Sequence, residues 1–366
     1  MNKKIGLLTL PLIANYGGIL QCLSLTFVLR KMGYEVTLID IRPSLKPTKR
    51  FLLYILARLP FQNIRGIREK FFKEKQNKET IQKYINKYTK KIENIDEFKN
   101  ESKKLVLDAI IVGSDQVWRY DYINNDMYSA YFLDFYDGKK ISYAASFGVD
   151  VWKHEDRRQL TKSLLEQFDA ISVREDTGID ICRDEFSIES VVHVLDPTML
   201  DLSFYDDLLS SHSSNHEAGY LLKYILDEKE TARVYSSIVK DNLGIVSEKD
   251  IHGDNKYYTL AEWVQAFKNA EYVITDSFHG MVFSIIFNKN FIAIGNKSRG
   301  LSRFISLLTL VGLEERLVYP EDITSSNTLS NVLLNDIDYS RVNKIVEAWR
   351  EKSLNYLANS LNNPKN

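Results

Sequence analysis

The sequence predicts an α/β protein whose parallel sheets are doubly wound by helices. Short runs such as residues 5–10 and 105–112 are apolar almost throughout, which indicates strands that are buried on both faces. Segments with apolar residues at helical spacing separate these runs, as in βαβ units. The chain has 366 residues, more than one ordinary core holds, so we expect two such domains.

The expected domain boundaries follow the order of these units. We expect an N-terminal α/β domain at residues 1–202, a C-terminal α/β domain at 203–337, and a helix at 338–366 that crosses back to the first domain. Ligands bind at the carboxyl ends of the strands in open α/β sheets. We therefore expect the two domains to face each other across a cleft.

Composition and charge exclude several classes of protein. With 48 basic and 49 acidic residues, the net charge of −1 does not favour nucleic-acid binding. Only Cys22 and Cys182 are cysteines, so there is no disulfide framework and no CxxC motif, and we expect a reducing, cytoplasmic location. His212 and His216 lack an evident third ligand, so we predict no metal site. No apolar stretch approaches the roughly 20 residues of a membrane span.

A basic segment at about residues 43–104 differs from the rest of the chain. Residues 42–104 contain 18 Lys or Arg and only 7 Asp or Glu. Within it, residues 51–58 and 67–73 mix apolar and basic side chains at helical spacing. One interpretation is a helical insertion with a solvated, charged face. The other is peripheral contact with an anionic membrane surface.

The first βαβ unit contains a glycine-rich turn, which is followed by a helix and a strand at residues 35–40. This turn consists of Asn15, Tyr16, Gly17 and Gly18. Paired glycines let a ligand approach the backbone closely, but the turn lacks the GxGxxG spacing of a dinucleotide site. From the residues alone, a binding loop and a sterically required tight turn remain alternatives.

Polar side chains follow the strand expected at residues 105–112. Asp115 can accept a proton from a hydroxyl, Gln116 can hydrogen-bond ligand oxygens, and Trp118 can stack on a ligand ring. Alternatively, Asp115 caps the next helix and Trp118 belongs to the core. Arg174, at the end of a later strand, can contact an anion or pair with Glu175.

The C-terminal domain contains the strongest candidate for an anion site. We expect strands at 220–226, 244–247 and 291–294, and a central strand that feeds a buried helix at about residue 280. Asp276 or Ser277 then becomes the N-cap. The first turn of this helix contains Phe278, His279 and Gly280, where backbone N–H groups and the positive end of the helix dipole favour anions. The alternative is a plain cap with a packed histidine.

The next strand-to-helix turn supplies cations beside this helix start. It contains Asn296, Lys297, Arg299 and Arg303. Guanidinium groups bind carboxylate and phosphate oxygens in two-point contacts. Two adjacent anion-binding turns indicate one ligand with two anionic ends.

Several motifs resemble those of the polysaccharide pyruvyl transferase family, in the same order from about residue 4 to 316. They are Asn15-Tyr16-Gly17-Gly18, the sequences at 113–118 and 142–148, Asp196-Pro197-Thr198, and 274–280 with its apolar helix. The resemblance implies a GT-B-like fold. It also implies transfer of a pyruvyl group from phosphoenolpyruvate to two hydroxyls of a sugar, which leaves a cyclic ketal.

The same resemblance implies the partners and the biological setting. Phosphoenolpyruvate is the co-substrate and no further cofactor is expected. The acceptor implied is a sugar or a lipid-linked oligosaccharide used for exopolysaccharide or capsule in the cell envelope. If the basic segment contacts an anionic membrane, the enzyme would lie at the inner face of that membrane, where a lipid-linked acceptor is presented.

We therefore assign roles to the motif residues. His279 is the predicted acid and Asp115 the predicted base. Predicted donor-binding residues are Ser277, Phe278, Gly280, Asn296, Lys297, Arg299 and Arg303; predicted acceptor-binding residues are Asn15, Tyr16, Gly17, Gly18, Gln116 and Trp118. Many family members place an Arg two residues before the motif His, where this chain has Ser277. Arg299 or Arg303 must replace that Arg.

Two other functions remain as alternatives. A GT-B glycosyltransferase would bind the diphosphate of a nucleotide sugar with the same helix start and arginines. A non-catalytic glycan-binding or assembly protein can also use this fold, because fold alone does not determine function.

Overall fold

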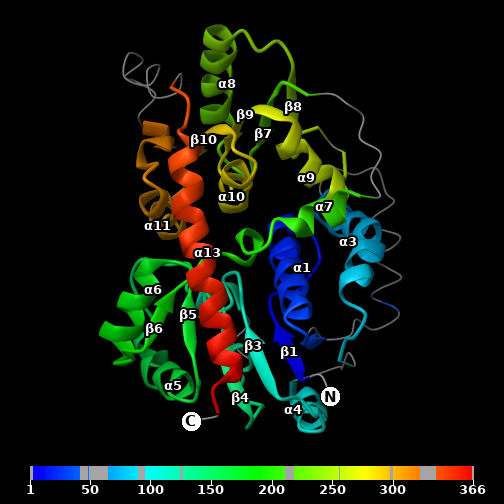
Figure 1. The fold of residues 1–366 in the computed structure, drawn as a ribbon, viewed down its shortest axis with the longest axis vertical. Helices are drawn as coiled ribbons and strands as arrows, with labels where there is room; N and C mark the ends of the chain where they lie inside the picture. The colour runs from blue at the N-terminus through cyan, green and yellow to red at the C-terminus, as the bar shows by residue number, and fades with distance from the viewer. Residues whose placement is uncertain are drawn as a thin grey trace. The chain divides into compact units, whose positions relative to one another are not determined.

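The computed structural model describes residues 3–41, 48, 65–89, 95–123, 127–210, 218–254, 256–296, 300–321 and 335–364. The chain divides into two compact units (Figure 1). Unit 1 comprises Met1–Asp201 together with Lys352–Asn366, and unit 2 comprises Leu202–Glu351. The division after Asp201 lies one residue before the boundary expected from the sequence.

Unit 1 is built on a parallel sheet with the strand order β2-β1-β3-β4. Its strands are β1 (Lys4–Leu8), β2 (Glu35–Ile39), β3 (Ala109–Val112) and β4 (Lys139–Ser142). A second parallel pair consists of β5 (Ile171–Val173) and β6 (Val191–His193). All residues of β3 and β4 are buried, as expected for strands covered on both faces. The strand expected at 105–112 begins only at Ala109.

The strands of unit 1 end at one level. The register places Leu8 beside Val112, and Val112 beside Ser142. Val173 of β5 forms a parallel bridge with Ala145, just after β4. The segments that follow these strands therefore leave the sheet along the same edge.

Helices connect the strands of unit 1. They are α1 (Tyr16–Lys31), α3 (Arg65–Tyr84), α4 (Ile95–Ser102), α5 (Glu155–Leu165) and α6 (Asp176–Asp180). Helix α13 (Tyr339–Asn362) contributes its residues from Lys352 onwards. Helix α1 joins β1 to β2 and is buried along most of its length, so its apolar residues are not confined to one face.

Unit 2 holds a five-stranded parallel sheet with the order β11-β10-β9-β7-β8. The strands are β7 (Tyr220–Tyr224), β8 (Glu248–Asp250), β9 (Ala270–Thr275), β10 (Asn290–Ile294) and β11 (Leu317–Val318). The helices are α7 (Ser203–Leu209), α8 (Lys229–Leu243), α9 (Leu260–Asn269), α10 (Phe278–Ile286), α11 (Ser302–Val311) and the first part of α13. Thr275 lies beside Tyr224 and Ala293, so β7, β9 and β10 share a carboxyl edge.

The strand expected at residues 244–247 lies later in the chain. Gly244 has φ 66° and ends α8 in the left-handed conformation, and its N–H bonds the carbonyl of Lys240. This C-cap suits glycine, which lacks a Cβ. The strand therefore starts only at Glu248.

Helix α3, which lies within the basic segment at about residues 43–104, has one buried face. Its buried residues Lys73, Asn77, Ile81 and Tyr84 recur every three or four positions, and α3 packs against α1. The ammonium of Lys73 lies 4.3 Å from the centroid of the Tyr16 ring. Residues 51–58 lie outside the described residues, so membrane contact stays a prediction. In the described part of the chain, no helix has both the length and the apolar character needed to span a membrane.

The close approach of α10 to β9 generates a testable prediction. A Cβ added to Gly280 would lie 2.1 Å from Thr275 Oγ1 and 2.9 Å from Thr275 Cβ. Thr275 has little freedom to move, because its hydroxyl donates to Tyr224 O and accepts from Ser277 N. Gly280→Ala should therefore lower the free energy of unfolding by about 1–3 kcal/mol in urea titrations.

Ser277→Ala is the matched control in the same turn. The Ser277 side chain makes no capping hydrogen bond and is only partly buried, so a change within about 0.5 kcal/mol is expected. Equal losses in the two variants would contradict the packing argument.

Candidate active site

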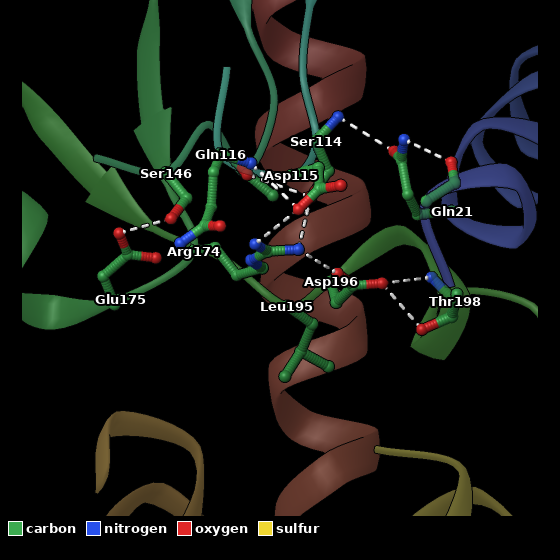
Figure 2. Close-up of polar contacts among 12 residues, drawn as sticks. Gln21, Ser114, Asp115, Gln116, Ser146, Arg174, Glu175, Leu195, Asp196 and Thr198 are labelled. Carbon is green, nitrogen blue, oxygen red and sulfur yellow. Dashed lines mark hydrogen bonds and ion pairs between the residues drawn. The ribbon is translucent and has the colours of Figure 1, made fainter. Parts of the chain in front are cut away.

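The polar residues of unit 1 meet at the shared carboxyl edge of its strands. Asp115 follows β3, Ser146 follows β4, Arg174 follows β5 and Asp196 follows β6. Figure 2 shows the side chains of Asp115, Arg174 and Asp196 turned toward one another, and that of Ser146 turned toward Glu175. This edge is where open α/β sheets bind ligands, so the strand ends place a polar cluster in the expected location.

Asp115 is held in an uncommon backbone conformation. Its φ of 76° lies in the left-handed region, which costs a non-glycine residue of order 1–3 kcal/mol. The preceding Gly113 has φ 125°, and a Cβ there would lie 2.1 Å from the carbonyl oxygen of Tyr143. Backbone N–H groups of Val117 and Ser146 both donate to Asp115 O, at 2.8 and 3.1 Å. Such conformations cluster at functional sites.

Arg174 joins two carboxylates in this cluster. Its Nη1 lies 2.9 Å from Asp196 Oδ2, and its Nη2 lies 3.4 Å from Asp115 Oδ1. The side chains of Arg174 and Asp196 are each 1% exposed and that of Asp115 is 8% exposed. At this depth the charges must compensate one another, because removing one partner leaves an unpaired buried charge.

The charge of Arg174 is stabilised by its neighbours. Burial alone would lower the pKa of Arg174, but the carboxylates of Asp196, Asp115 and Glu175 raise it above its ordinary value. The guanidinium therefore stays protonated throughout the range in which proteins fold.

A second set of hydrogen bonds fixes the partners of Arg174. Asp196 Oδ1 accepts from the N and Oγ1 of Thr198, at 3.0 and 2.7 Å. Glu175 Oε1 accepts from Ser146 Oγ at 2.7 Å. On the other side, Gln21 accepts from the backbone N of Ser114 at 3.0 Å (Figure 2). Carboxylates held in this way keep one orientation.

The end of α13 supports this cluster from behind. Leu195, the residue before Asp196, donates its N–H to Ser353 Oγ at 3.0 Å. Tyr356 donates its hydroxyl to the carbonyl of Ser142 at 2.9 Å, and Tyr143 donates to Leu195 O at 3.1 Å. The segments after β4 and β6 are thus tied to the last helix.

Asn15 lies beside Asp115, as the predicted acceptor site requires. Its Nδ2 is 3.5 Å from Asp115 Oδ2, and the residue is exposed at the start of α1. A Cβ on Gly18 would lie 2.9 Å from Asn15 Nδ2 and 3.2 Å from Asp115 Oδ2. Glycine at position 18 thus permits this close approach of helix and carboxylate.

The predicted stacking role of Trp118 is wrong. Its ring is fully buried, stacks on Phe132 with centroids 5.3 Å apart, and donates its N–H to Tyr131 O. Tyr16 and Gly17 are likewise buried in the first turn of α1, and the Tyr16 ring packs against Lys73. These residues shape the site without presenting a ring or an open backbone to a ligand.

Gln116 fits the predicted binding role better. It is buried, and its Nε2 has no hydrogen-bond partner among the described residues. Buried amide donors are normally paired, so this group is suited to receive an oxygen of a ligand.

In unit 2 the capping prediction needs correction. Ser277 is the N-cap of α10 but makes no side-chain capping bond. The Asp276 carboxylate turns away and accepts from the N–H groups of Leu226, Asp227 and Glu228, at 2.7, 2.7 and 3.0 Å. It thereby fixes the loop after β7, and Ser277 leaves the first turn of α10 without a cap from its own side chain.

His279 and Arg303 flank this helix start. The His279 ring packs edge-on to Phe278, with centroids 5.3 Å apart, and the residue is 6% exposed. The Arg303 guanidinium lies 5.3 Å from the Phe278 ring centroid and is also buried. Phe278 thus contacts both a cation and an imidazole.

The remaining predicted donor residues have mixed outcomes. Asn296 donates to Glu228 Oε1 at 3.1 Å, which links the loops after β10 and β7. Gly280 is required by the packing of α10 on Thr275 rather than by a ligand. Lys297 and Arg299 lie outside the described residues.

Sequence reasoning missed the importance of Arg174 and Asp196. It weighed Glu175 as the partner of Arg174, whereas the hydrogen bonds of Arg174 go to Asp196 and Asp115. The available signal was position, since Arg174 follows a short buried strand just as Asp115 does.

Within the described ranges, no group of three His, Cys, Asp or Glu side chains is placed to hold a metal ion. His212 and His216 fall in residues 211–217, which the description does not cover.

The support from α13 can be tested by its effect on stability. Ser353→Ala removes the acceptor of the buried Leu195 N–H, and an unsatisfied buried donor costs about 1–3 kcal/mol. We expect that loss in the free energy of unfolding measured in urea. The control is Ser163→Ala, because the Ser163 hydroxyl donates to Leu160 O within α5 at an exposed site. A loss in the control as large as that in Ser353→Ala would contradict the support role.

Comparison with solved structures identifies the fold. The chain is similar to UGT89C1 of Arabidopsis thaliana complexed with UDP-L-rhamnose, with 10% identity, a TM-score of 0.54, and coverage of 99% of both chains. It is also similar to the UDP-GlcNAc 2-epimerase of Methanocaldococcus jannaschii in complex with UDP-GlcNAc and UDP. There the identity is 12% and the TM-score 0.50, with 94% of this chain and 99% of the other covered.

The α/β units with parallel sheets and these neighbours together establish a two-domain, Rossmann-like GT-B fold. Among curated proteins, no sequence match was found. The sequence model of the polysaccharide pyruvyl transferase family matches residues 15–298, which is most of the chain. This protein therefore belongs to the polysaccharide pyruvyl transferase family.

Proposed function

We propose that this enzyme transfers a pyruvyl group from phosphoenolpyruvate to two hydroxyls of a sugar, which forms a cyclic ketal. The observation that carries the proposal is the helix start of α10, where the side chains of His279 and Arg303 both contact Phe278 and the N-cap Ser277 makes no side-chain capping bond. Phosphoenolpyruvate has a carboxylate and a phosphate, and both groups suit a helix N-terminus and a guanidinium. Arg303 supplies a cation in place of the Arg that many relatives carry two residues before the motif His.

The chemistry needs a proton at the enol carbon and stabilisation of the departing phosphate. In the proposed reaction His279 donates a proton to the methylene carbon, which makes the adjacent carbon electrophilic. One sugar hydroxyl adds to that carbon. The second hydroxyl then displaces phosphate, which leaves with the electrons of the broken C–O bond. Arg303 and the helix start stabilise the growing negative charge of the phosphate.

Unit 1 supplies the acceptor groups in this proposal. Asp115 accepts the proton of an attacking hydroxyl, and the second hydroxyl proton is taken up by the departing phosphate or returned to His279. Asn15 and Gln116 orient the sugar through hydrogen bonds. The acceptor class is a sugar or a lipid-linked oligosaccharide, because the family acts in polysaccharide synthesis.

Donor identity can be tested by thermal unfolding. A ligand that binds only the folded state raises the free energy of unfolding, by about 2.7 kcal/mol at a hundredfold excess over Kd, and so raises the Tm. We expect millimolar phosphoenolpyruvate to raise the Tm, and Arg303→Gln to reduce that shift. Glu230→Gln alters an exposed side chain elsewhere in unit 2 and should retain the shift. A shift with sugar nucleotides alone would instead support glycosyl transfer.

The role of His279 has a separate test. His279→Gln keeps a polar side chain in the first turn but cannot donate a proton as an acid. Loss of a general acid lowers the rate by roughly 100- to 10,000-fold. We expect this loss in phosphate release from phosphoenolpyruvate with an acceptor panel, while the thermal shift persists. Unchanged phosphate release would remove His279 from the mechanism.

A further inference from the structure

Arg174 is a buried cation that contacts two carboxylates, and these carboxylates have different surroundings. Asp196 is held by Thr198 deep in unit 1, whereas Asp115 lies beside the exposed Asn15. We propose that Arg174 is a positioning residue that acts through Asp115: it keeps Asp115 ionised and turned toward the acceptor. This inference rests on the proposed function, in which Asp115 contacts the sugar hydroxyl.

The two oxygens of Asp115 have different surroundings. Oδ1 accepts from the backbone N of Gln116 at 2.9 Å and from Arg174 Nη2 at 3.4 Å. Oδ2 lies on the side of Asn15, at 3.5 Å from its Nδ2. Two donors thus anchor Oδ1, and Oδ2 is presented toward the exposed start of α1. An arginine in contact with a carboxylate also favours its charged form.

Asp196 reduces the stabilisation of ionised Asp115 by Arg174, because both carboxylates contact the same guanidinium. Its distance to Arg174 is 2.9 Å, against 3.4 Å for Asp115. Thr198 donates two hydrogen bonds to the other oxygen of Asp196, which stabilises its negative charge. The attraction that Arg174 exerts on Asp115 is therefore weakened by the charge of Asp196. This relation gives the two residues opposite effects on the protonation of Asp115.

Other titratable groups around this cluster stay uncharged near neutral pH. Burial raises the pKa of Tyr143 well above its ordinary value. Burial lowers the pKa of His193, whose Nε2 lies 3.0 Å from the carbonyl of Arg174. The carboxylates that act on the charge of Arg174 are Asp196, Asp115 and Glu175, and Arg119 is a further buried cation in the loop that contains Asp115. In the proposal, the balance between Arg174 and these carboxylates sets the protonation of Asp115.

The test is the pH profile of phosphate release from phosphoenolpyruvate, measured for the full chain with an acceptor panel. Arg174→Gln should move the acidic limb of kcat/KM up by about 1–2 pH units, because Asp115 loses its cation. Arg174→Lys should recover most of that shift. Asp196→Asn should move the limb down, because a negative charge that competes with Asp115 for Arg174 is then removed. Arg183→Gln is the control, since Arg183 is a half-exposed arginine paired with Asp180 and Asp184.

A purely structural role for Arg174 gives a different pattern. It would lower the rate equally at every pH, or move the limb in the same direction for Arg174→Gln and Asp196→Asn. Either result would overturn the proposal. Opposite shifts, with no shift in Arg183→Gln, would support it.

A second measurement separates this inference from the proposed reaction. The free energy of unfolding of Asp115→Asn relative to the parent, followed from pH 7 to acid in urea, reports the protonation of Asp115 by linkage. If Arg174 acts as proposed, this difference changes at a higher pH in the Arg174→Gln background. If phosphoenolpyruvate is not turned over but this shift appears, the proposed function fails and the pairing holds. No shift in this titration would overturn the proposal whatever the activity.

Discussion

Unit 1 depends on the pairing of a buried cation with buried carboxylates. Arg174 and Asp196 have side chains that are each 1% exposed, so neither charge has water to stabilise it. Their attraction is effective only because Thr198, Ser114 and the strand ends hold them in place. The parallel register brings this about, since β3, β4, β5 and β6 deliver their following residues to one edge. The strand register thus determines where the polar cluster forms, and the ion pairs of the cluster hold the strand ends together.

Unit 2 also uses a buried carboxylate after a strand, but there the carboxylate binds backbone N–H groups of a loop. Asp276 directly follows β9 and uses its carboxylate to hold the loop after β7 through three backbone N–H groups. That interaction fixes the loop, and the N-cap Ser277 makes no side-chain capping bond at the start of α10. Phe278 then serves as a shared surface for His279 and Arg303. The carboxylate of Asp276 thus supports the architecture beside the helix start at which we propose that the donor binds.

Much of the fold was predictable because hydrophobic periodicity is local. The buried runs that became β1, β9 and β10 were recognisable from residue order alone. The site was less predictable because it depends on contacts distant in sequence. Trp118 is suited to stack on a sugar or on Phe132, and only the fold decides between them. Likewise, Arg174 and Asp115 are 59 positions apart, and no local pattern shows that they pair.

Helix α13 has a consequence for how the chain is made. Unit 1 consists of two pieces of sequence, and all of unit 2 is synthesised between them. The hydroxyls of Ser353 and Tyr356 reach residues that were made 158 and 214 positions earlier. While unit 2 is being synthesised, the N-terminal part of unit 1 therefore lacks the hydrogen bonds that Ser353 and Tyr356 later make to it. Contacts of such long range form late, and they reduce the rate of folding.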